Sequence, residues 1–313
     1  MSTYITVDGG TTTTRVTLVR DYKILDTIKI NVGARANMED ETLLKNALKN
    51  AIVEILQKKG LTESDVTRIL ASGMITCEFG LCNLPHIFAP AGISEMHKNM
   101  HEQSFPEISS VPFVFVRGVK TKADSFENTD MMRGEETELM GIINPDFGKC
   151  VYVLPGSHSK IIQTDEKSRI TDFSTMLTGE MIASLSQYTI LKDAVDLSTE
   201  TFEESFLLKG YTCAKQDGLN KTLFKTRILK NLYGANSTET YSFFIGAVLC
   251  DEIESIIKAD AKTVVLGGKA QIKNAMACIL QNCSDKNLVV LDAKAVDEST
   301  AMGLVRIYEY KEC

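Results

Sequence analysis

A short acidic segment, MRGEETEL at residues 132–139, places one guanidinium and three carboxylates within six residues: Arg133, Glu135, Glu136 and Glu138. A buried carboxylate can remove a proton from an attacking hydroxyl, and an arginine can bind an anionic substrate through paired hydrogen bonds. On a helix, Glu135 and Glu138 would share one face. A solvated helix N-terminus is also rich in acids, because the helix dipole favours them there. The segment by itself leaves both interpretations open.

A glycine turn near the N-terminus, DGGTTTTR at residues 8–15, has the composition of an anion-binding loop. Glycine lets successive amide hydrogens converge on one point, threonine hydroxyls add donors, and an aspartate at the end of a strand can hold Mg²⁺. The turn leads into a strand, so it is neither a P-loop nor a dinucleotide fingerprint. A plain hairpin turn is the competing interpretation.

Two later segments have the same character. LPGSHSK (154–160) joins two strand patterns, and its Ser157, His158 and Lys160 could meet a phosphate. VLGGK (265–269) places Gly267 and Gly268 between a strand and a helix, where a ligand can approach closely. A lone histidine in a turn is more often structural than catalytic. The three turns together carry more weight than any one of them.

The elements that must position these turns alternate between strand and helix patterns, which predicts an α/β protein. Closely spaced strands at 4–7, 15–19 and 24–31 predict an antiparallel meander, followed by an amphipathic helix over 41–60. A helix is predicted from Gly134. It leads into a second unit with the same order of elements as the first: a strand, a glycine turn, a strand and a further strand. The DEST segment predicts a closing helix from about Ser299.

Composition excludes several classes of protein. The 313 residues allow two domains, and the net charge of -7 argues against binding of duplex nucleic acid. No apolar run reaches the length of a membrane span, and no secretion signal is apparent. Eight scattered cysteines indicate reduced thiols, so we expect a cytoplasmic protein.

The order of the three turns resembles that of the actin-like ATPase and sugar-kinase superfamily. The resemblance implies two ribonuclease H-like domains, each with a phosphate-binding hairpin, and an active-site cleft between them. We expect the N-terminal domain to cover 1–133, joined by the closing helix 298–313, and the C-terminal domain to cover 134–297.

Five segments in this order, DGGTTTTR, ASGM, MRGEETEL, LPGSHSK and DFSTMLTGE, resemble the 2-dehydro-3-deoxygalactonokinase family more closely. The resemblance implies ATP-dependent phosphorylation of 2-dehydro-3-deoxy-D-galactonate at its 6-hydroxyl. Family members often have a DWGSTN-like first turn, an aromatic residue at position 161 and small residues after ASGM. This chain has Gly9, Ile161 and the segment 75–78 instead, and the last change concerns the presumed sugar pocket.

The resemblance also implies roles for particular residues. Asp8 is the expected Mg²⁺ ligand. A looser resemblance, to exopolyphosphatases that have a catalytic glutamate in a helix before the second hairpin, makes Glu136 the first candidate for the base; the other candidates for the base are Glu135, Asp172 and His158. Substrate binding is assigned to Arg133, Gly73, Met74, Thr76, Thr178, Gly179 and Glu180. Binding of ATP is assigned to Gly10, Thr11, Thr12, Arg15, Gly156, Ser157, His158, Lys160, Gly267 and Gly268.

Other functions within the superfamily remain open at this point. The chain could be a kinase for another sugar acid, a phosphohydrolase acting on polyphosphate or nucleotides, or an inert sensor. A phosphohydrolase for a polyanion would need a basic channel, whereas this chain is acidic. A sensor would not need the base. A homodimer is compatible with the sequence.

Overall fold

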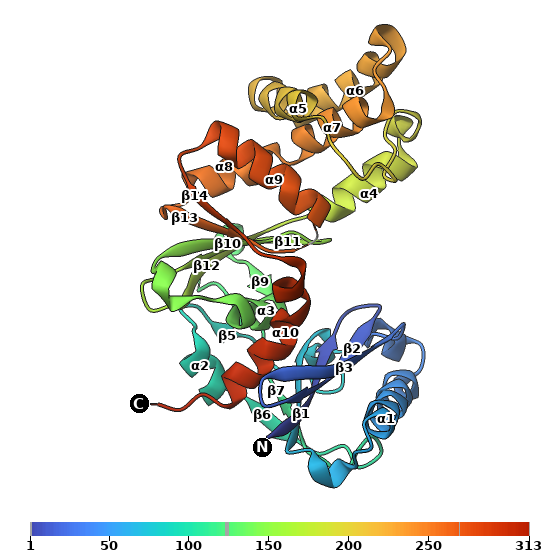
Figure 1. Cartoon of the computed structure of the whole chain (residues 1–313), viewed down its shortest axis with the longest axis vertical. Coiled ribbons are helices and arrows are strands. Elements are labelled where there is room, and N and C mark those ends of the chain that lie inside the picture. Colours follow the sequence, from blue (N-terminus) through green and yellow to red (C-terminus); the bar gives the residue numbers. More distant parts are fainter. Residues whose placement is uncertain (1, 123–124, 269, 313) are drawn as a thin grey trace. The chain divides into compact units, whose positions relative to one another are not determined.

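The computed structural model describes residues 2–122, 125–268 and 270–312. By packing, the chain divides into two compact units, which we describe separately. Unit 1 comprises Met1–Pro145, Lys167–Asp172 and Lys294–Cys313, and unit 2 comprises Asp146–Glu166 and Phe173–Ala293. Both contain sheets and helices, so the predicted α/β class is confirmed (Figure 1).

Unit 1 is built on a six-stranded sheet in the order β3-β2-β1-β4-β7-β6. Its first three strands form the predicted meander, whereas β4 and β7 run parallel to β1. The bounds are β1 Thr3–Gly9, β2 Thr14–Arg20, β3 Lys23–Ile30, β4 Arg68–Gly73, β6 His101–Gln103 and β7 Phe113–Phe115. A small second sheet contains β5 Ile87–Phe88, β8 Val119–Lys120 and β9 Met131–Met132.

The core of unit 1 lies between the six-stranded sheet and α1 (Glu41–Lys58). Leu44, Leu48 and Ile55 recur at helical spacing and pack against inward-facing strand residues such as Ile5 and Val16. The helix begins where the Asp40 side chain accepts from the Thr42 amide. The other helices of unit 1 are α2 Ile93–Lys98, α3 Glu135–Ile142, α10 Ala293–Tyr308 and the short 3-10 turns η1 Ala34–Met38, η2 Glu63–Asp65, η3 Met74–Thr76 and η4 Phe126–Asn128.

Helices α3 and α10 meet through glycine. A Cβ on Gly303 would lie 1.9 Å from the Thr137 carbonyl oxygen, and one on Gly141 would lie 1.8 Å from the Ser299 carbonyl oxygen. Only residues without a side chain permit so close an approach of two helix backbones. Arg306 Nη1 also donates to the Gly141 carbonyl at the end of α3 (2.9 Å). Helix α10 therefore fixes the position of α3. We call α3 the acidic helix, because its first turn contains Glu135, Glu136 and Glu138.

The sheet of unit 2 has five strands in the order β12-β11-β10-β13-β14, and the first residues of β12, up to Asp172, are grouped with unit 1. An antiparallel hairpin, β10–β11, continues into parallel pairings of β10 with β13 and of β13 with β14. This order repeats the first five strands of the sheet of unit 1. The bounds are β10 Cys150–Leu154, β11 Ser159–Thr164, β12 Ile170–Met176, β13 Thr263–Leu266 and β14 Asn287–Val290.

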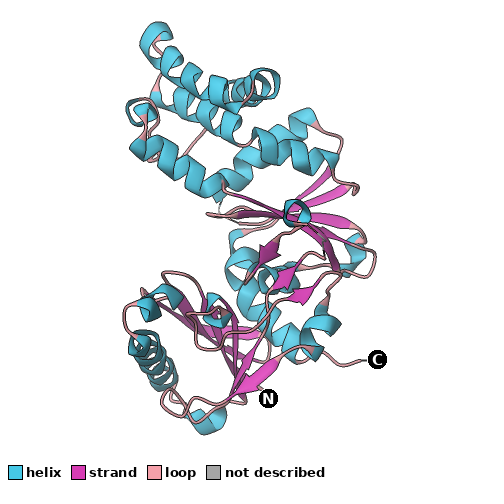
Figure 2. Ribbon diagram, turned by 180° about the vertical axis from the view of Figure 1, so that it is seen from behind, coloured by secondary structure: helices cyan, strands magenta, loops and turns pink. Residues whose placement is uncertain are grey.

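The helices of unit 2 gather over its sheet, as the ribbon coloured by secondary structure shows (Figure 2). Helix α7 is buried from Thr240 to Val248 and lies in the centre of this group, packed closely against α5. The bounds are α4 Thr178–Tyr188, α5 Glu204–Asp217, α6 Leu219–Tyr233, α7 Ser237–Val248, α8 Cys250–Lys258 and α9 Ala270–Cys283, with 3-10 turns η5 Pro145–Phe147 and η6 Ile190–Asp193.

Two expected boundaries differ from the structure. The closing helix begins at Ala293, before Ser299, and the Ser299 hydroxyl donates to the Val296 carbonyl of the same helix rather than capping it. The packing units separate after Pro145, not after residue 133, because α3 packs on α10. The last residue of the expected 298–313 segment lies outside the described residues.

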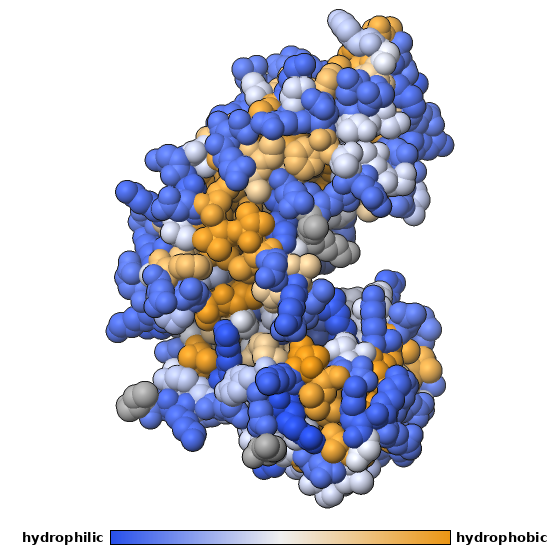
Figure 3. Space-filling view, in the orientation of Figure 1, coloured by the Kyte–Doolittle hydropathy of each residue, from blue (hydrophilic) through white to orange (hydrophobic). Residues whose placement is uncertain are grey.

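Within the described ranges, no helix is both long enough and apolar enough to cross a membrane. Figure 3 shows one face of the molecule, which is covered mainly by hydrophilic side chains and has local groups of apolar ones.

Candidate active site

The first glycine turn joins β1 to β2. The Gly10 amide donates to the Thr13 carbonyl (2.9 Å), and the side chains of Thr11 and Thr12 are exposed. A neighbouring loop supports the turn from behind, because the amides of Ala34 and Arg35 donate to the carbonyls of Gly10 and Thr11. The turn is therefore held at its carbonyl side while its threonine side chains face solvent.

Asp8 lies at the end of β1, directly opposite Arg15 in the strand pairing. Arg15 Nη1 is 4.0 Å from Asp8 Oδ2, and the two side chains are 49% and 34% exposed. Burial raises the pKa of Asp8, Arg15 opposes this shift, and the charge of Glu135 adds to it. Asp8 thus belongs to the same electrostatic cluster as the acidic helix.

Helix α3 begins directly after Gly134 and carries this cluster. The Gly134 amide donates to both carboxylate oxygens of Glu136 (2.9 and 2.8 Å), and the side chain of Glu136 is fully buried. The Arg133 amide donates to Glu135 Oε2 (3.1 Å). The first turn of the helix therefore turns its glutamates back towards its own N-terminal amides.

Two carboxyls of α3 titrate far above the usual range. Burial and the neighbouring charge of Glu135 raise the pKa of Glu136 to about 8. Burial, followed by the charges of Asp8 and Glu135, raises the pKa of Glu138 to about 8 as well. A cluster of carboxyls that resists ionisation in this way is suited to accept a proton or to bind a cation.

Gly73 lets this helix approach the first hairpin. Gly73 pairs with Gly9 across β4 and β1 and has φ +86, a conformation that strains any residue with a side chain. A Cβ on Gly134 would lie only 3.3 Å from Gly73 Cα. Three glycines thus bring β1, β4 and the start of α3 together.

Arg133 binds the segment that follows Gly73. Its Nη1 donates to the Thr76 carbonyl (2.7 Å) and to Thr76 Oγ1 (2.6 Å), and its Nη2 to the Leu84 carbonyl (3.2 Å). Thr76 is fully buried, and its own hydroxyl donates to the Gly73 carbonyl. The structure brings these predicted substrate residues together, but the contacts favour a supporting role for Thr76. Met74 is half-buried beside it.

In unit 2, the second glycine turn joins β10 to β11, and its residues Gly156, Ser157 and His158 are exposed. The start of α4 packs directly on this turn. A Cβ on Gly179 would lie 2.3 Å from the Gly156 carbonyl oxygen, and the Glu180 amide donates to the Ser157 carbonyl (3.3 Å). His158 Nε2 lies 2.9 Å from Glu180 Oε1.

The Gly267–Gly268 turn packs on the other side of the same loop. The Gly267 amide donates to the Val153 carbonyl (2.8 Å), and a Cβ on Gly268 would lie 2.5 Å from the Pro155 carbonyl oxygen. The structure therefore brings together three predicted groups of unit 2: the exposed loop, the start of α4 and the double glycine. The α4 residues were expected to bind sugar, yet their contacts are with the loop.

Two predicted residues of unit 2 are turned into the interior. Lys160 is 4% exposed, and its Nζ donates to Thr175 Oγ1 on β12 (2.6 Å). Thr178 is 5% exposed, and its hydroxyl donates to Glu252 Oε2 (2.6 Å). Neither side chain is presented to solvent with the loop, so these contacts do not favour direct ligand binding.

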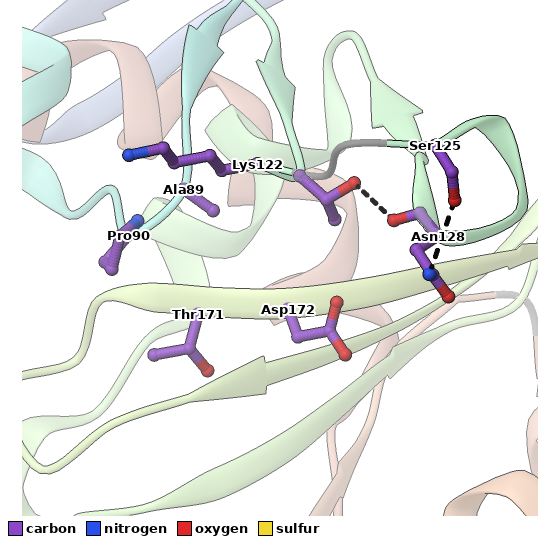
Figure 4. A pocket seen from close by; sticks show the side chains of 8 residues that line it. Ala89, Pro90, Lys122, Ser125, Asn128, Thr171 and Asp172 are labelled. Atoms are coloured by element: carbon purple, nitrogen blue, oxygen red, sulfur yellow. Dashed lines mark hydrogen bonds between the residues drawn. The ribbon is translucent and has the colours of Figure 1, made fainter.

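Asp172, a candidate base, lines a polar pocket of unit 1 with a volume of about 470 Å³ (Figure 4). It and Thr171 lie across the pocket from Ser125 and Asn128, and Lys122 also lines it. The pocket is large enough for a small ligand. None of the residues that line it belongs to the acidic helix.

Sequence reasoning gave no role to two carboxyls that the structure places at these sites. Glu138 lies in the electrostatic cluster of Asp8, and its position three residues after Glu135 was the available signal. Glu252 lies on the buried face of α8, where an acid at helical spacing from Ile256 was the signal.

Comparison with known proteins decides the family. The sequence model of 2-keto-3-deoxy-galactonokinase matches residues 8–307. The chain belongs to this family. The resemblance inferred from the sequence is thereby confirmed. A curated relative, 2-dehydro-3-deoxygalactonokinase of Escherichia coli K12, is 24% identical over 292 residues, which cover 90% of each chain.

Solved structures show the same fold. A protein of Sinorhizobium meliloti, provisionally named as a 2-dehydro-3-deoxygalactonokinase, superposes with a TM-score of 0.79 at 21% identity, covering 99% of this chain and 98% of its own. The activator of the 2-hydroxyisocaproyl-CoA dehydratase from Clostridium difficile, with bound ADPNP, superposes with a TM-score of 0.51 at 11% identity, covering 98% of this chain and 95% of its own. The predicted actin-like ATPase fold is confirmed.

Proposed function

We propose that this protein transfers the terminal phosphoryl group of ATP to the 6-hydroxyl of 2-dehydro-3-deoxy-D-galactonate. Membership of the kinase family supports the reaction class, and the name of the Escherichia coli relative supports the substrate. The observation that carries the proposal is the repeated hairpin. In each unit, the first two strands of the main sheet form an antiparallel hairpin, β1–β2 in unit 1 and β10–β11 in unit 2. An exposed glycine turn joins the two strands in both hairpins.

The proton of the attacking hydroxyl needs an acceptor, and we assign this role to Glu136. The oxygen of the sugar forms a bond to the γ-phosphorus, the bond from phosphorus to the β-phosphate oxygen breaks, and the proton moves to the carboxylate. A pKa of about 8 makes Glu136 a stronger base than an ordinary glutamate. The half-buried Glu135 is the competing base, and Asp172 and His158 are the further candidates.

The phosphates of ATP are assigned to the two glycine turns. In unit 1, these residues are Gly10, Thr11 and Thr12, with Arg15 as counter-charge, and in unit 2 they are Gly156, Ser157 and His158. Converging amides and hydroxyls are the groups that proteins use to hold phosphate oxygens. Gly267 and Gly268 are assigned to adenosine, since a turn without side chains admits a flat ligand closely.

The donor groups fit Mg²⁺. Among the described residues, no group of three or more acidic, histidine or cysteine side chains is placed to hold a metal alone. Mg²⁺ keeps several waters and is usually held by one or two carboxylates together with substrate phosphates. Asp8, partly exposed beside the first turn, can supply such a carboxylate. When bound, the ion neutralises charge on the phosphates.

For the sugar acid, we assign the carboxylate to the half-buried Arg133, with Gly73 and Met74 beside it. Thr76 holds Arg133 in place from the interior, and Thr178 and Gly179 support the phosphate turn instead of touching sugar. Glu180 lies at the surface next to His158 and can accept from a sugar hydroxyl.

The test is the release of ADP from ATP and Mg²⁺ with a panel of acceptors: 2-dehydro-3-deoxygalactonate, 2-dehydro-3-deoxygluconate, hexoses and water alone. The proposal expects stimulation chiefly by the first acid. Preference for another acid would show that the protein acts on a related substrate. Release of ADP without any sugar would indicate a phosphohydrolase. If no acceptor stimulates release of ADP, the proposed kinase activity is contradicted.

A further inference from the structure

Glu252, in the interior of unit 2, is a carboxyl that the proposed reaction does not use. It lies on α8 and is 2% exposed. Thr178 Oγ1 donates to its Oε2 (2.6 Å), whereas its Oε1 is buried without a hydrogen-bond partner in the described part of the chain. A buried acceptor without a partner lowers stability, because the group has lost its water. Its presence therefore needs an explanation other than stability.

The groups that face Glu252 belong to the two elements that flank the second glycine turn. Thr178 is the first residue of α4, and Ser159, whose hydroxyl also favours the ionised form of Glu252, is the first residue of β11. Ser159 Oγ accepts weakly from the Gly156 amide (3.4 Å). Gly179, next to Thr178, packs on the Gly156 carbonyl. Glu252 thus holds the start of α4, which packs on the turn, from a buried position.

An apolar side chain of similar size would fill this position with less loss of stability, since burial of a carboxyl is unfavourable unless it is fully paired. Burial raises the pKa of Glu252 to about 7, with the hydroxyls of Thr178 and Ser159 opposing the shift. An apolar residue, however, could not accept the hydrogen bond from the Thr178 hydroxyl.

We infer that Glu252 is a positioning residue for nucleotide binding: by accepting a hydrogen bond from Thr178, it fixes the start of α4 against the Gly156 turn. The inference rests on the proposed function in one respect, namely that this turn binds the phosphates of the nucleotide. A nucleoside diphosphate is then the ligand whose affinity depends most on Glu252.

The experiment compares Glu252→Leu, Glu252→Gln and wild type by calorimetric titration of the intact protein with ADP and Mg²⁺. We expect the Kd of ADP to rise at least about fivefold in Glu252→Leu, the size of one lost hydrogen bond, with no fall in melting temperature. Glu252→Gln keeps an acceptor for Thr178 and should restore most of the affinity. The KM for the sugar acid should change less than the Kd of ADP in both variants.

Glu254→Gln is the matched control. Glu254 lies on the same helix but accepts from Tyr211 and Lys215, away from the turn, so its replacement should leave ADP affinity unchanged. If Glu252→Leu does not fold, Thr178→Val removes the same contact from the α4 side and should weaken ADP equally.

A change of less than about fivefold in the folded variant would overturn the inference, as would the absence of ADP binding by wild type. Failure of the proposed function has a different signature. In that case the wild-type protein still binds ADP, but no sugar acid stimulates the formation of ADP from ATP.

Discussion

At the scale of single residues, the decisive feature is a glutamate that is fully buried and difficult to ionise. Glu136 and Glu135 are adjacent on α3, yet one carboxylate is turned onto the Gly134 amide and the other onto the Arg133 amide. Their different burial makes the two residues a natural matched pair for assigning the base.

We expect Glu136→Gln to lower kcat by a factor of about 100 or more, because the amide cannot accept the proton of the hydroxyl. The KM for ATP should change little, since the phosphates are assigned to other residues. Steady-state kinetics of purified protein with the sugar acid measures both. Glu135→Gln should lose less than about tenfold. The reverse order of the two variants would transfer the role to Glu135.

The pH dependence of wild type follows from the same group. A base must be ionised to act, so kcat/KM should rise with pH and level off above a midpoint near the pKa of about 8. Since the charge of Glu135 contributes to this high pKa, Glu135→Gln should move the midpoint to lower pH. Rate profiles from pH 6 to 9.5 measure both effects. A midpoint that rises in Glu135→Gln would contradict this arrangement.

At the scale of elements, the sites depend on close contacts between backbones that glycine permits. The start of α4 on the Gly156 turn, and α10 on α3, are the two clearest cases. Substitution of these glycines separates effects on nucleotide binding from effects on the acidic helix.

Gly179→Ala would place a Cβ 2.3 Å from the Gly156 carbonyl oxygen, so the turn must shift. We expect the Kd of ADP to rise by roughly tenfold or more, with the protein still folded. Gly218→Ala, in the loop between α5 and α6, is the control. Its positive φ makes the substitution mildly destabilising, but a Cβ there meets nothing within 4 Å. Equal ADP affinities in the two variants would exclude a role for this contact.

Gly303→Ala would place a Cβ 1.9 Å from the Thr137 carbonyl oxygen and push α10 away from α3. We expect a loss of roughly 2–4 kcal/mol in the free energy of unfolding, since overpacking of a helix contact is strongly destabilising. Chemical denaturation measures the loss, and Met302→Ala at the neighbouring position serves as the control. A variant as stable as the control would show that α3 does not depend on this contact.

Much of this architecture could be predicted from the sequence. Periodicity located the strands of both hairpins, α1 and α3, because local hydrophobic patterns determine such elements. The residues of the exposed turns were also identified. The inward orientation of Lys160 and Thr178 and the burial of Glu252 could not be predicted, because they depend on contacts between segments far apart in the chain. The start of α10 was placed too late, because Ser299 has the composition of a cap but bonds within the helix.

At the scale of the whole molecule, carboxyls with a raised pKa add to one another in their effect on stability. Asp8, Glu136, Glu138 and Glu252 all have pKa values raised by burial, so the native state binds more protons than the unfolded chain above the ordinary glutamate range. Stability contributed by these groups is therefore present at low pH and is lost as pH rises towards about 8.

We expect wild type to lose more stability between pH 6 and pH 8.5 than Glu136→Gln does, by roughly 1–3 kcal/mol, because the variant has one group fewer to ionise in the interior. Melting temperatures at the two pH values, measured without nucleotide or metal, report the difference. Parallel pH dependence of the two proteins would show that Glu136 ionises as easily in the native state as in the unfolded chain.

The interleaved order of the two units has a consequence for synthesis. Unit 1 contains residues from before, within and after the sequence of unit 2, and its helix α10 follows the whole of unit 2 along the chain. On the ribosome, the hairpin and α3 emerge early but lack their partner helix until all of unit 2 has been translated. A nascent chain arrested before Ala293 could complete the sheet of unit 2, yet it would hold its acidic helix unsupported. Packing of the α3 glutamates against α10 is thus among the last events in the folding of unit 1.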